Sequence, residues 1–449
     1  MPDRIIYYTV IILLTGGVVF TYSLSFYATV NFNVGEFTFA TKQFLFASLS
    51  IVTMWILSRL NPDVWIHKIG MTFFIGGLIT IIAMEFLPSS IVPPIGGATR
   101  WIKIGPLSIA PVEFYKIGFV YFLAWSMSRK IDSSIEKPTL MDELQLFLPY
   151  ILIFLISILF IGIGQKDLGQ TMLLSFSFLI LAFFAGGSRR FFSLGLSGLF
   201  IVFIIFSISQ PHRVQRLLSW WGGVQEPIAE IMPDFMRQYI IFENTESQFQ
   251  VSQALSAISN GGLTGQGLGN GIFKYGYLPE VHTDFILEGV AEELGFLSIV
   301  VILTMFLILI QRILKVANRS KEPRFMLFGI GIAVIIGLGL LINTYGATGL
   351  LPMKGLPVPF LSYGGSAILA LSIGIGMVLM ISKRGVEEDK KDDFSESLQP
   401  SINRDEYDGV NLLKEEREIE YVDFEHDGYF EEYEKRRDQR NAYSRHPEF

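Results

Sequence analysis

The sequence predicts an all-α protein that crosses a membrane many times, with about ten transmembrane helices. Of its 449 residues, 51% are hydrophobic, only 17% are charged and 39 are phenylalanine. The apolar residues fall into blocks of about 20, which is the length that spans a bilayer as an α-helix. There is no cysteine, so disulfides and thiolate metal sites are excluded.

The spans can be placed in order along the chain. The first apolar run follows only Arg4 and is long for the core of a signal peptide, so we expect it to be a retained span. The second run is short and needs flanking residues to cross. The ten predicted spans are 5–26, 44–57, 69–87, 112–127, 144–163, 168–185, 191–209, 285–310, 325–345 and 362–381.

The distribution of lysine and arginine predicts that both chain termini are cytoplasmic. Cytoplasmic loops carry an excess of these residues, and with the N-terminus inside the inner loops hold most of them. The opposite orientation would leave nearly all of these cations outside. The inner cations are Arg59, Lys68, Arg129, Lys130, Lys137, Arg189, Arg190, Arg312, Lys315, Arg319, Lys321, Arg324, Lys383 and Arg384.

The loops on the predicted outer side are uneven and carry a second group of cations. The loop at 210–283, between spans seven and eight, exceeds seventy residues, and loops of that length are usually functional. Its glycine cluster at 261–270 is not followed by Gly-Lys-Ser/Thr, so it is no nucleotide P-loop, and we expect a flexible hinge. Lysine and arginine residues in the loops on the outer side suit an anionic ligand such as a phosphate-bearing lipid. They are Arg100, Lys103, Lys166, Arg213, Arg216, Arg237, Lys274 and Lys354.

The C-terminal segment differs in composition from the rest of the chain. Residues 385–449 carry 21 acidic and 10 basic residues, a net charge of −11, whereas residues 1–384 carry +4 of the total of −7. An acidic, polar segment that is poor in aliphatic residues is typical of disorder. We therefore predict two parts, a membrane domain at 1–384 and a disordered cytoplasmic tail at 385–449.

A run of carboxylates marks the entry to the eighth span, in the sequence YLPEVHTDFILEGVAEELG at 277–295. Asp284, Glu288 and Glu292 are four residues apart and share one helical face. Carboxylates at a membrane surface indicate a functional site. An alternative is that Thr283 and Asp284 cap the helix while the glutamates favour its positive N-terminus.

Other polar groups suggest structural roles. Glu113 and Lys116 are three residues apart on the fourth span and can neutralise each other. Asp167, just before the sixth span, fits a helix cap. The five histidines form no metal-ligand cluster, so no metal site is predicted.

Six short motifs, in this order along a ten-span chain, identify the sequence as similar to the SEDS family (shape, elongation, division and sporulation). They are GATRWI at 97–102, DLG at 167–169, PHRVQR from 211, GQGLGN at 265–270, LPEVHTDFILEGVAEELG at 278–295 and LPMKGLPVPFLSYGGS at 351–366. The resemblance covers about 5–383. Lys354 resembles the cell-division members rather than the elongation members. Lys166, where the family has proline, and Glu288, where it usually has a small or apolar residue, depart from the pattern.

The resemblance implies a peptidoglycan glycosyltransferase that polymerises lipid II at the outer face of the bacterial cytoplasmic membrane, at the division septum. By that pattern Asp284 is the essential carboxylate of the site, and we expect it to act as a base. Because the helix N-terminus favours the carboxylate, we predict that Asp284 is ionised at neutral pH and that its pKa is not strongly raised. The residues expected to bind the substrate and its phosphates are Arg100, Lys103, Arg213, Arg216, His282, Lys354 and Ser362.

No organic cofactor is implied; a divalent cation, Mg²⁺ or Mn²⁺, fits the chemistry but has no recognisable site. The implied partners are a class B penicillin-binding protein, which supplies crosslinking, and other membrane proteins of the division complex; no nucleic acid is implied. Two alternatives remain, a lipid II flippase and a non-catalytic division scaffold. A flippase should show polar sites reachable from both sides, and the inner half lacks them.

Overall fold

The computed structural model describes residues 2–95, 97–105, 107–130, 139–208, 246–351 and 355–398. Contacts divide the chain into two units, Met1–Asp393 and Phe394–Phe449. Nearly all described residues belong to the first unit. The predicted tail lies outside the described residues beyond 398, and its predicted disorder stays a prediction.

Helices occupy all ten predicted spans. In the described part of the large loop lies a further helix, α11, and the short helix α2 follows the first span. The elements are α1 (Arg4–Leu24), α2 (Phe26–Asn31), α3 (Thr38–Leu57), α4 (Pro62–Met84), β1 (Ile102–Ile104), β2 (Leu107–Ile109), α5 (Pro111–Lys130), α6 (Leu140–Ile158), the π-helix η1 (Leu159–Gly164), α7 (Leu168–Phe184), α8 (Arg189–Ile208), α11 (Glu246–Gly261), η2 (Phe273–Tyr275), α12 (Ile286–Arg319), α13 (Pro323–Ala347) and α14 (Gly365–Leu398).

Seven of the described helical segments are long and apolar enough to cross a membrane: α1, α3, α4, α6 with η1, α12, α13 and the Gly365–Gly385 part of α14. The chain is thus a multi-pass membrane protein with a mostly helical fold. Helix α7 is apolar but has only 17 residues. Helix α5 carries Glu113, Lys116, Arg129 and Lys130 in its 20 residues. The full count of ten spans and the side on which the termini lie stay predictions.

Polar residues at the helix starts explain several of the boundaries. Asp3 accepts hydrogen bonds from the first backbone N–H groups of α1, and Asn61 does the same for α4, whose first residue is proline. Thr139 and Asp142 form a capping box at the start of α6. Each cap satisfies amide groups that have no partner inside the helix.

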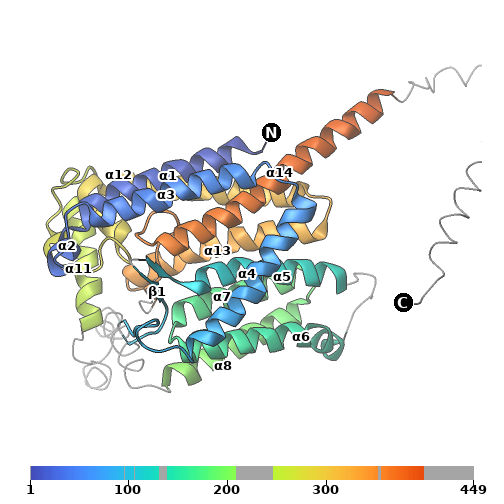
Figure 1. Cartoon of the computed structure of the whole chain (residues 1–449), viewed down its shortest axis with the longest axis horizontal. Helices are drawn as coiled ribbons and strands as arrows, with labels where there is room; N and C mark the ends of the chain where they lie inside the picture. Colours follow the sequence, from blue (N-terminus) through green and yellow to red (C-terminus); the bar gives the residue numbers. More distant parts are fainter. Residues whose placement is uncertain are drawn as a thin grey trace, which may run out of the picture. The chain divides into compact units, whose positions relative to one another are not determined.

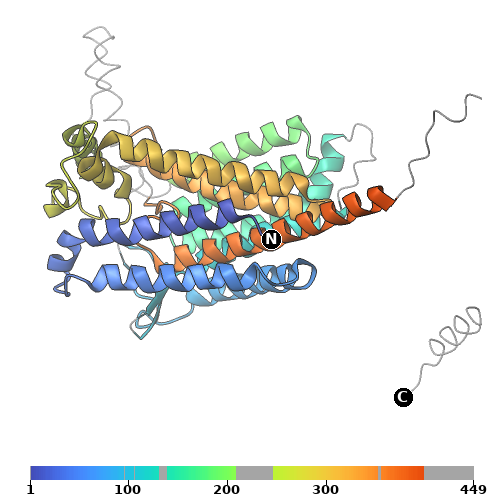
Figure 2. The same ribbon diagram turned by 90° about the horizontal axis from the view of Figure 1, so that it is seen from above.

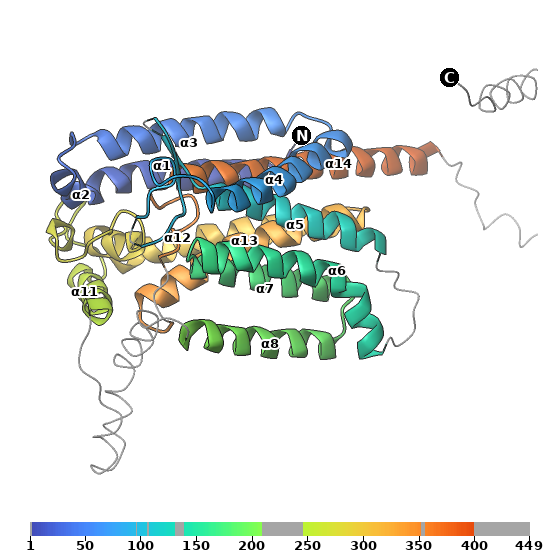
Figure 3. The ribbon, with the colours of Figure 1, turned by 60° about the horizontal axis from the view of Figure 1, so that its bottom comes forward.

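The helices form a bundle with α13 at its centre. Helix α13 contacts α12, α5 and α7, while α1 contacts α3 and α12. Figures 1 and 3 show α1 and α3 on one side of this bundle and α6 and α8 on the opposite side. In the most apolar 18-residue stretch of α13 and of α14, 72% is buried inside the protein, whereas the corresponding share is 22–39% in the other five candidate spans. The less buried helices keep apolar faces outward, as expected of helices in contact with lipid.

The two ends of the bundle differ. One end carries α2, α11 and the β1–β2 hairpin, as Figures 1 and 2 show. At the other end an ion-pair network joins Asp63, at the start of α4, to Arg324 (3.1 Å) and Arg384 (2.5 Å). Glu322 pairs with the same two arginines. These arginines belong to the cations that the sequence assigns to the cytoplasm.

Candidate active site

The stretch before α12 folds into a tight turn that presents Asp284. The backbone N–H groups of Thr283 and Asp284 both donate to the carbonyl of Glu280 at 3.0 Å. Glu280 itself has φ 57°, a left-handed conformation that is rare and strained for a residue other than glycine. The predicted alternative, that Thr283 and Asp284 merely cap α12, is wrong, since the N-cap residue is Phe285 and it makes no side-chain cap bond. The turn therefore needs support from outside.

That support comes from the loop between α13 and α14. The Ser362 hydroxyl donates to the carbonyl of Thr283 at 2.5 Å and accepts from the N–H of Val358 at 2.8 Å. The N–H of Tyr363 donates to the carbonyl of His282 at 2.9 Å. Ser362, expected to bind substrate, thus holds the turn in place.

Asn343 also joins the Asp284 turn to the loop between α13 and α14. It lies on α13, is 5% exposed, and its amide group donates to the carbonyl of Asp284 and to that of Leu356, each at 2.7 Å. Gly355, with φ 61°, approaches so closely that a Cβ there would lie 2.8 Å from an Asp284 carboxylate oxygen. Only glycine allows this approach, so the described part of the motif, from 355 onward, contacts the carboxylate at Gly355.

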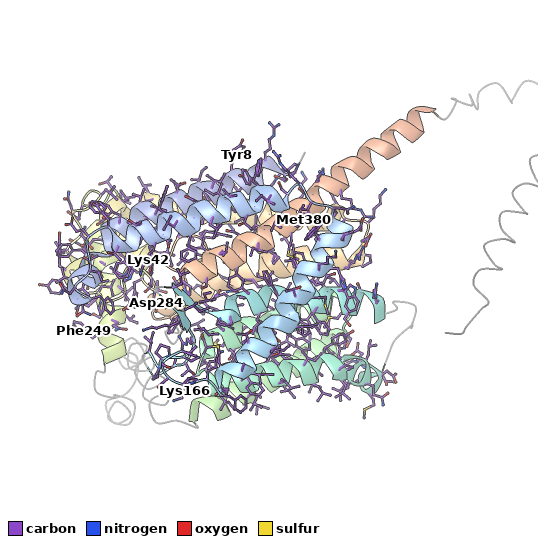
Figure 4. The ribbon with its side chains drawn as sticks, in the orientation of Figure 1. Tyr8, Lys42, Lys166, Phe249, Asp284 and Met380 are labelled. Carbon is purple, nitrogen blue, oxygen red and sulfur yellow. The ribbon has the colours of Figure 1, made fainter. Side chains whose placement is uncertain are left out.

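The environment of Asp284 differs from the sequence prediction. The side chain is half-buried, but protein surrounds the carboxylate closely, and this desolvation raises the pKa of Asp284 to about 7. The negative charges of Glu280 and Asp167 also raise this pKa, and the positive charge of Arg100 lowers it. The prediction of an aspartate with no strong upward shift was wrong because desolvation outweighs the helix N-terminus. Figure 4 labels Asp284 near the end of the bundle that carries the hairpin.

Arg100 reaches this region from the β1–β2 side and is held by the turn before α7. Its Nε lies 3.2 Å from the Asp167 carboxylate, and its guanidinium donates to the carbonyl of Lys166 at 3.2 Å. Asp167 accepts from the N–H of Gln170, which confirms its predicted role as the N-cap of α7. The π-helix η1 ends just before this turn, and such helices occur often at functional sites.

The other predicted cations have different surroundings. Lys103 lies on β1 with an exposed side chain, and Lys166 is also exposed. Lys274 is 4% exposed and its ammonium lies 2.7 Å from Glu293, so it neutralises a buried carboxylate. Arg213, Arg216, Arg237 and Lys354 lie outside the described residues, and their roles stay predictions.

Two glutamates of α12 hold the described part of the large loop, from 246 onward, against the bundle. Glu292 accepts hydrogen bonds from Asn260 (2.9 Å) and from the N–H of Ile272 (2.7 Å). Glu293 accepts from Ser23 and pairs with Lys274. Both glutamates therefore have a structural role. Glu288 is buried, 2% exposed, and one of its oxygens has no hydrogen-bond partner among the described residues.

The glycine cluster at 261–270 is not the hinge that the sequence suggested. It packs against α12, where the N–H groups of Gln266 and Gly267 donate to the carbonyls of Glu292 and Glu293 at 3.0 and 2.8 Å. Gly265 adopts φ 82°, and a Cβ there would clash with the α12 backbone. The glycines permit close backbone contact.

Glu113 and Lys116 form the predicted ion pair, with 2.5 Å between Glu113 Oε2 and Lys116 Nζ, and Gln170 donates to the other carboxylate oxygen at 2.6 Å. All three side chains are buried. Lys116 and Gln170 also line a small cavity together with Pro357 and Ser362 of the loop between α13 and α14. The pair is structural.

Sequence reasoning missed Asn343, Gln43 and Glu280. Asn343 stands in an otherwise apolar span, and Gln43 at the start of another donates to the carbonyl of Ser362 at 3.1 Å. A polar side chain inside a span is a signal of function or of interhelical bonding, so both were findable. The left-handed backbone of Glu280 leaves no mark in the sequence.

Among the described residues, no group of three or more histidine, aspartate or glutamate side chains lies close enough together to hold a metal ion.

Comparison with known proteins gives one consistent result. Residues 3–386 match the family model FtsW/RodA/SpoVE, described as cell cycle protein. A probable peptidoglycan glycosyltransferase FtsW of Helicobacter pylori is 43% identical over 382 residues, which cover 85% of this chain and 98% of that protein. A chain from a peptidoglycan synthase complex that coordinates polymerisation and crosslinking is similar in structure, with a TM-score of 0.65, 22% identity, and 86% and 98% of the two chains covered. The crystal structure of RodA from Thermus thermophilus gives a TM-score of 0.56 at 21% identity, with 85% and 97% covered.

Proposed function

This chain belongs to the FtsW/RodA/SpoVE family of cell cycle proteins, and we propose that it is a peptidoglycan glycosyltransferase that polymerises lipid II into glycan strands during cell division. The observation that carries the site is the Asp284 carboxylate, presented by a strained turn that two separate segments hold in place. Strain of about 1–3 kcal/mol at a residue such as Glu280 persists only where the surroundings enforce it. Enforced geometry of this kind is typical of catalytic groups.

The reaction joins the 4-hydroxyl of an acceptor sugar to C1 of a lipid-pyrophosphate donor, with inversion. The new C1–O bond forms as the bond from C1 to the phosphate oxygen breaks, and the pyrophosphate leaves with the electron pair. Asp284 accepts the hydroxyl proton as a general base. A carboxylate with a pKa of about 7 is a stronger base than an ordinary aspartate and is still largely ionised just above neutral pH.

The departing pyrophosphate needs positive charge. Arg100 is the described candidate, since it lies close enough for its charge to act on Asp284. Arg213, Arg216 and Lys354 are proposed to share this task, with Lys103 and His282 around the rest of the substrate, while Ser362 holds the turn that carries Asp284. A Mg²⁺ or Mn²⁺ ion, if one takes part, would draw most of its ligands from the pyrophosphate and from water.

The end of the bundle that carries the hairpin and α11 is proposed to face outward, with the protein in the cytoplasmic membrane at the division septum. The charge distribution between loops supports this orientation. A class B penicillin-binding protein is the proposed partner, supported by the similarity to a chain of a synthase complex that also crosslinks.

The test of this function is polymerisation of purified lipid II by wild type and Asp284→Asn, with and without the cognate penicillin-binding protein, on a glycan-resolving gel. The substitution is nearly isosteric and removes the base, so we expect a glycan ladder from wild type and none from the variant. Equal thermal unfolding temperatures would show that the variant is folded.

The alternatives predict other results. A scaffold should tolerate Asp284→Asn in cells, since the division complex would still assemble. A flippase should move labelled lipid II across liposomes while making no glycan even with the partner. Either outcome would replace the glycosyltransferase assignment.

A further inference from the structure

A basic and aromatic patch lies at the end of the bundle opposite the β1–β2 hairpin. At this end α3 finishes, the chain turns into α4, and α5 finishes beside the start of α4, as Figures 1 and 2 show. Each of these three helices or its end places one cation over the ring of a tryptophan. The pairs, with the distance from the cation to the ring centroid, are Arg59 over Trp55 (3.7 Å), Lys68 over Trp65 (5.4 Å) and Arg129 over Trp125 (4.6 Å). We call these six residues the basic–aromatic patch.

Local contacts keep the three pairs on neighbouring helix ends. His67, which precedes Lys68 on α4, packs against the ring of Trp125 on α5, with 5.2 Å between the ring centroids. On the other side, only the turn from α3 into α4 separates Arg59 from Trp65, whose N–H donates to the carbonyl of residue 61 at 3.1 Å. The patch is therefore one surface built from three helix ends.

The three cations of the patch keep their charge available for a ligand. Arg59, Lys68 and Arg129 are exposed, and in the part of the chain that the structure describes none of them pairs with a carboxylate. The carboxylates of Asp63 and Glu322 at the same end of the bundle are already paired with other arginines. An indole face holds a cation in place but does not neutralise it, so its N–H groups can still donate to an anionic oxygen.

An apolar surface leads up to these cations. Val52, Trp55, Ile56 and Arg59 are spaced i, i+3, i+4 and i+7, so they share one face at the end of α3. Val52 and Ile56 keep 51% and 48% of their surfaces exposed, and the two indoles of α3 and α4 are also exposed. Because α3 is a candidate membrane span, this face meets lipid tails and ends in a cation. Tryptophan is enriched at that depth, where tails meet head groups.

We propose that the basic–aromatic patch binds an anionic phospholipid, whose phosphate meets Arg59, Lys68 and Arg129 while its acyl chains lie on the apolar face of α3. Basic residues beside a membrane span attract anionic head groups, and the apolar face adds a contact that a free phosphate ion cannot make. The site lies at the end of the bundle opposite the hairpin, so the inference is independent of the proposed polymerase activity. It assigns a lipid-binding role to the turn between α3 and α4.

The test measures the binding of fluorescent phosphatidylglycerol to the delipidated full-length protein in an uncharged detergent, by fluorescence anisotropy. Phosphatidylcholine with the same acyl chains and label has no net charge and gives the contribution of the tails alone. We expect the wild type to bind phosphatidylglycerol more tightly by about tenfold or more. Arg59→Gln combined with Lys68→Gln should weaken this binding about 25-fold, since each basic residue at an anionic lipid surface contributes about fivefold. The same variant should bind phosphatidylcholine as the wild type does.

Lys315→Gln combined with Arg319→Gln is the matched control. These are again one lysine and one arginine, both exposed and near the end of α12, at the end of the bundle where Glu322 pairs with Arg384. Within the described structure neither lies over an aromatic ring. The control loses the same charge, but its phosphatidylglycerol binding should fall by about twofold or less. An equal loss in both double variants would indicate a diffuse charge effect and overturn the proposal, as would equal affinity of the wild type for the two lipids.

Two further measurements test the ligand and the indoles. Inorganic phosphate in large excess should not displace the labelled phosphatidylglycerol, because it lacks acyl chains; displacement would mean a phosphate site and overturn the lipid assignment. Trp55→Leu combined with Trp65→Leu keeps the charge and an apolar surface but removes the rings under two cations, and it should weaken binding about fivefold. Unchanged binding would remove the indoles from the site. All the substituted side chains are exposed, so the unfolding temperatures without lipid should match that of wild type.

Discussion

At the scale of single residues, the charges around Asp284 oppose one another. Desolvation and the carboxylates of Glu280 and Asp167 raise its pKa, while Arg100 lowers it, and the result is about 7. A base with this pKa is ionised when the pH is above 7 and protonated below it. The neighbouring charges therefore set the pH range in which the residue can accept a proton.

We predict that kcat falls as the pH drops through about 7, because protonated Asp284 cannot act as a base. Glu280→Gln removes a negative charge that raises this pKa, so the acid limb of the profile should move to lower pH. The measurement is the rate of lipid II polymerisation at saturating substrate between pH 5 and 9.

Thr283→Val tests whether the shift comes from charge. Thr283 donates its hydroxyl to a Glu280 carboxylate oxygen at 3.1 Å, but its substitution changes no formal charge. The acid limb of the pH–rate profile should therefore shift less from its wild-type position in Thr283→Val than in Glu280→Gln. A limb that does not move in Glu280→Gln would contradict the electrostatic role of that residue.

At the scale of elements, α12 consists of two parts that meet at Gly295. Gly295 has φ 78° and ψ 175°, which no helix allows. The break lets the loop at 262–265 reach the α12 backbone, where the N–H of Phe296 donates to the carbonyl of Gly262 at 2.9 Å. The first part belongs to the site and the second to the bilayer.

We predict that Gly295→Ala destabilises the protein by about 1–3 kcal/mol, since a side chain is strained at this φ and its Cβ would lie 2.3 Å from the carbonyl of Leu263. The measurement is the unfolding temperature in detergent. Gly76→Ala is the control, because Gly76 lies within α4 and a Cβ there meets nothing within 4 Å. It should be neutral or stabilise by up to about 1 kcal/mol; equal effects of the two substitutions would contradict the strained break.

At the scale of the whole membrane unit, ion pairs occur in two settings. The Glu113–Lys116 pair with Gln170 is buried between α5 and α7. The network of Asp63, Arg324 and Arg384 lies at one end of the bundle and is partly exposed. Buried charges depend on their partners, whereas exposed pairs are screened by water and salt.

We predict that Lys116→Ala destabilises the protein by about 3–5 kcal/mol, because it leaves the Glu113 carboxylate buried without its partner. Asp63→Asn should cost no more than about 1 kcal/mol. The measurement is the unfolding temperature of each variant and of wild type at low and at high salt. High salt should reduce the destabilisation caused by Asp63→Asn but leave that caused by Lys116→Ala unchanged. If salt instead reduced only the effect of Lys116→Ala, the assignment of Glu113–Lys116 as a buried pair would be refuted.

The sequence by itself determined the membrane class, the place of each long apolar helix and the site motifs. Apolar runs of about 20 residues have one stable form in a bilayer, because only a helix satisfies its own backbone there. The role of Asp167 as a helix cap and the pairing of Glu113 with Lys116 also followed from local spacing.

Only the tertiary structure decided how distant segments meet. The hydrogen bonds of Asn343 join the Asp284 turn to a loop seventy residues further along the chain. The pKa of Asp284 depends on packing, on the charge of Glu280 in the same turn and on the charges of Arg100 and Asp167 from two other segments, and the glycine cluster gains its order from α12. Spacing along a chain reports local geometry, but desolvation and long-range hydrogen bonds arise only when the helices pack.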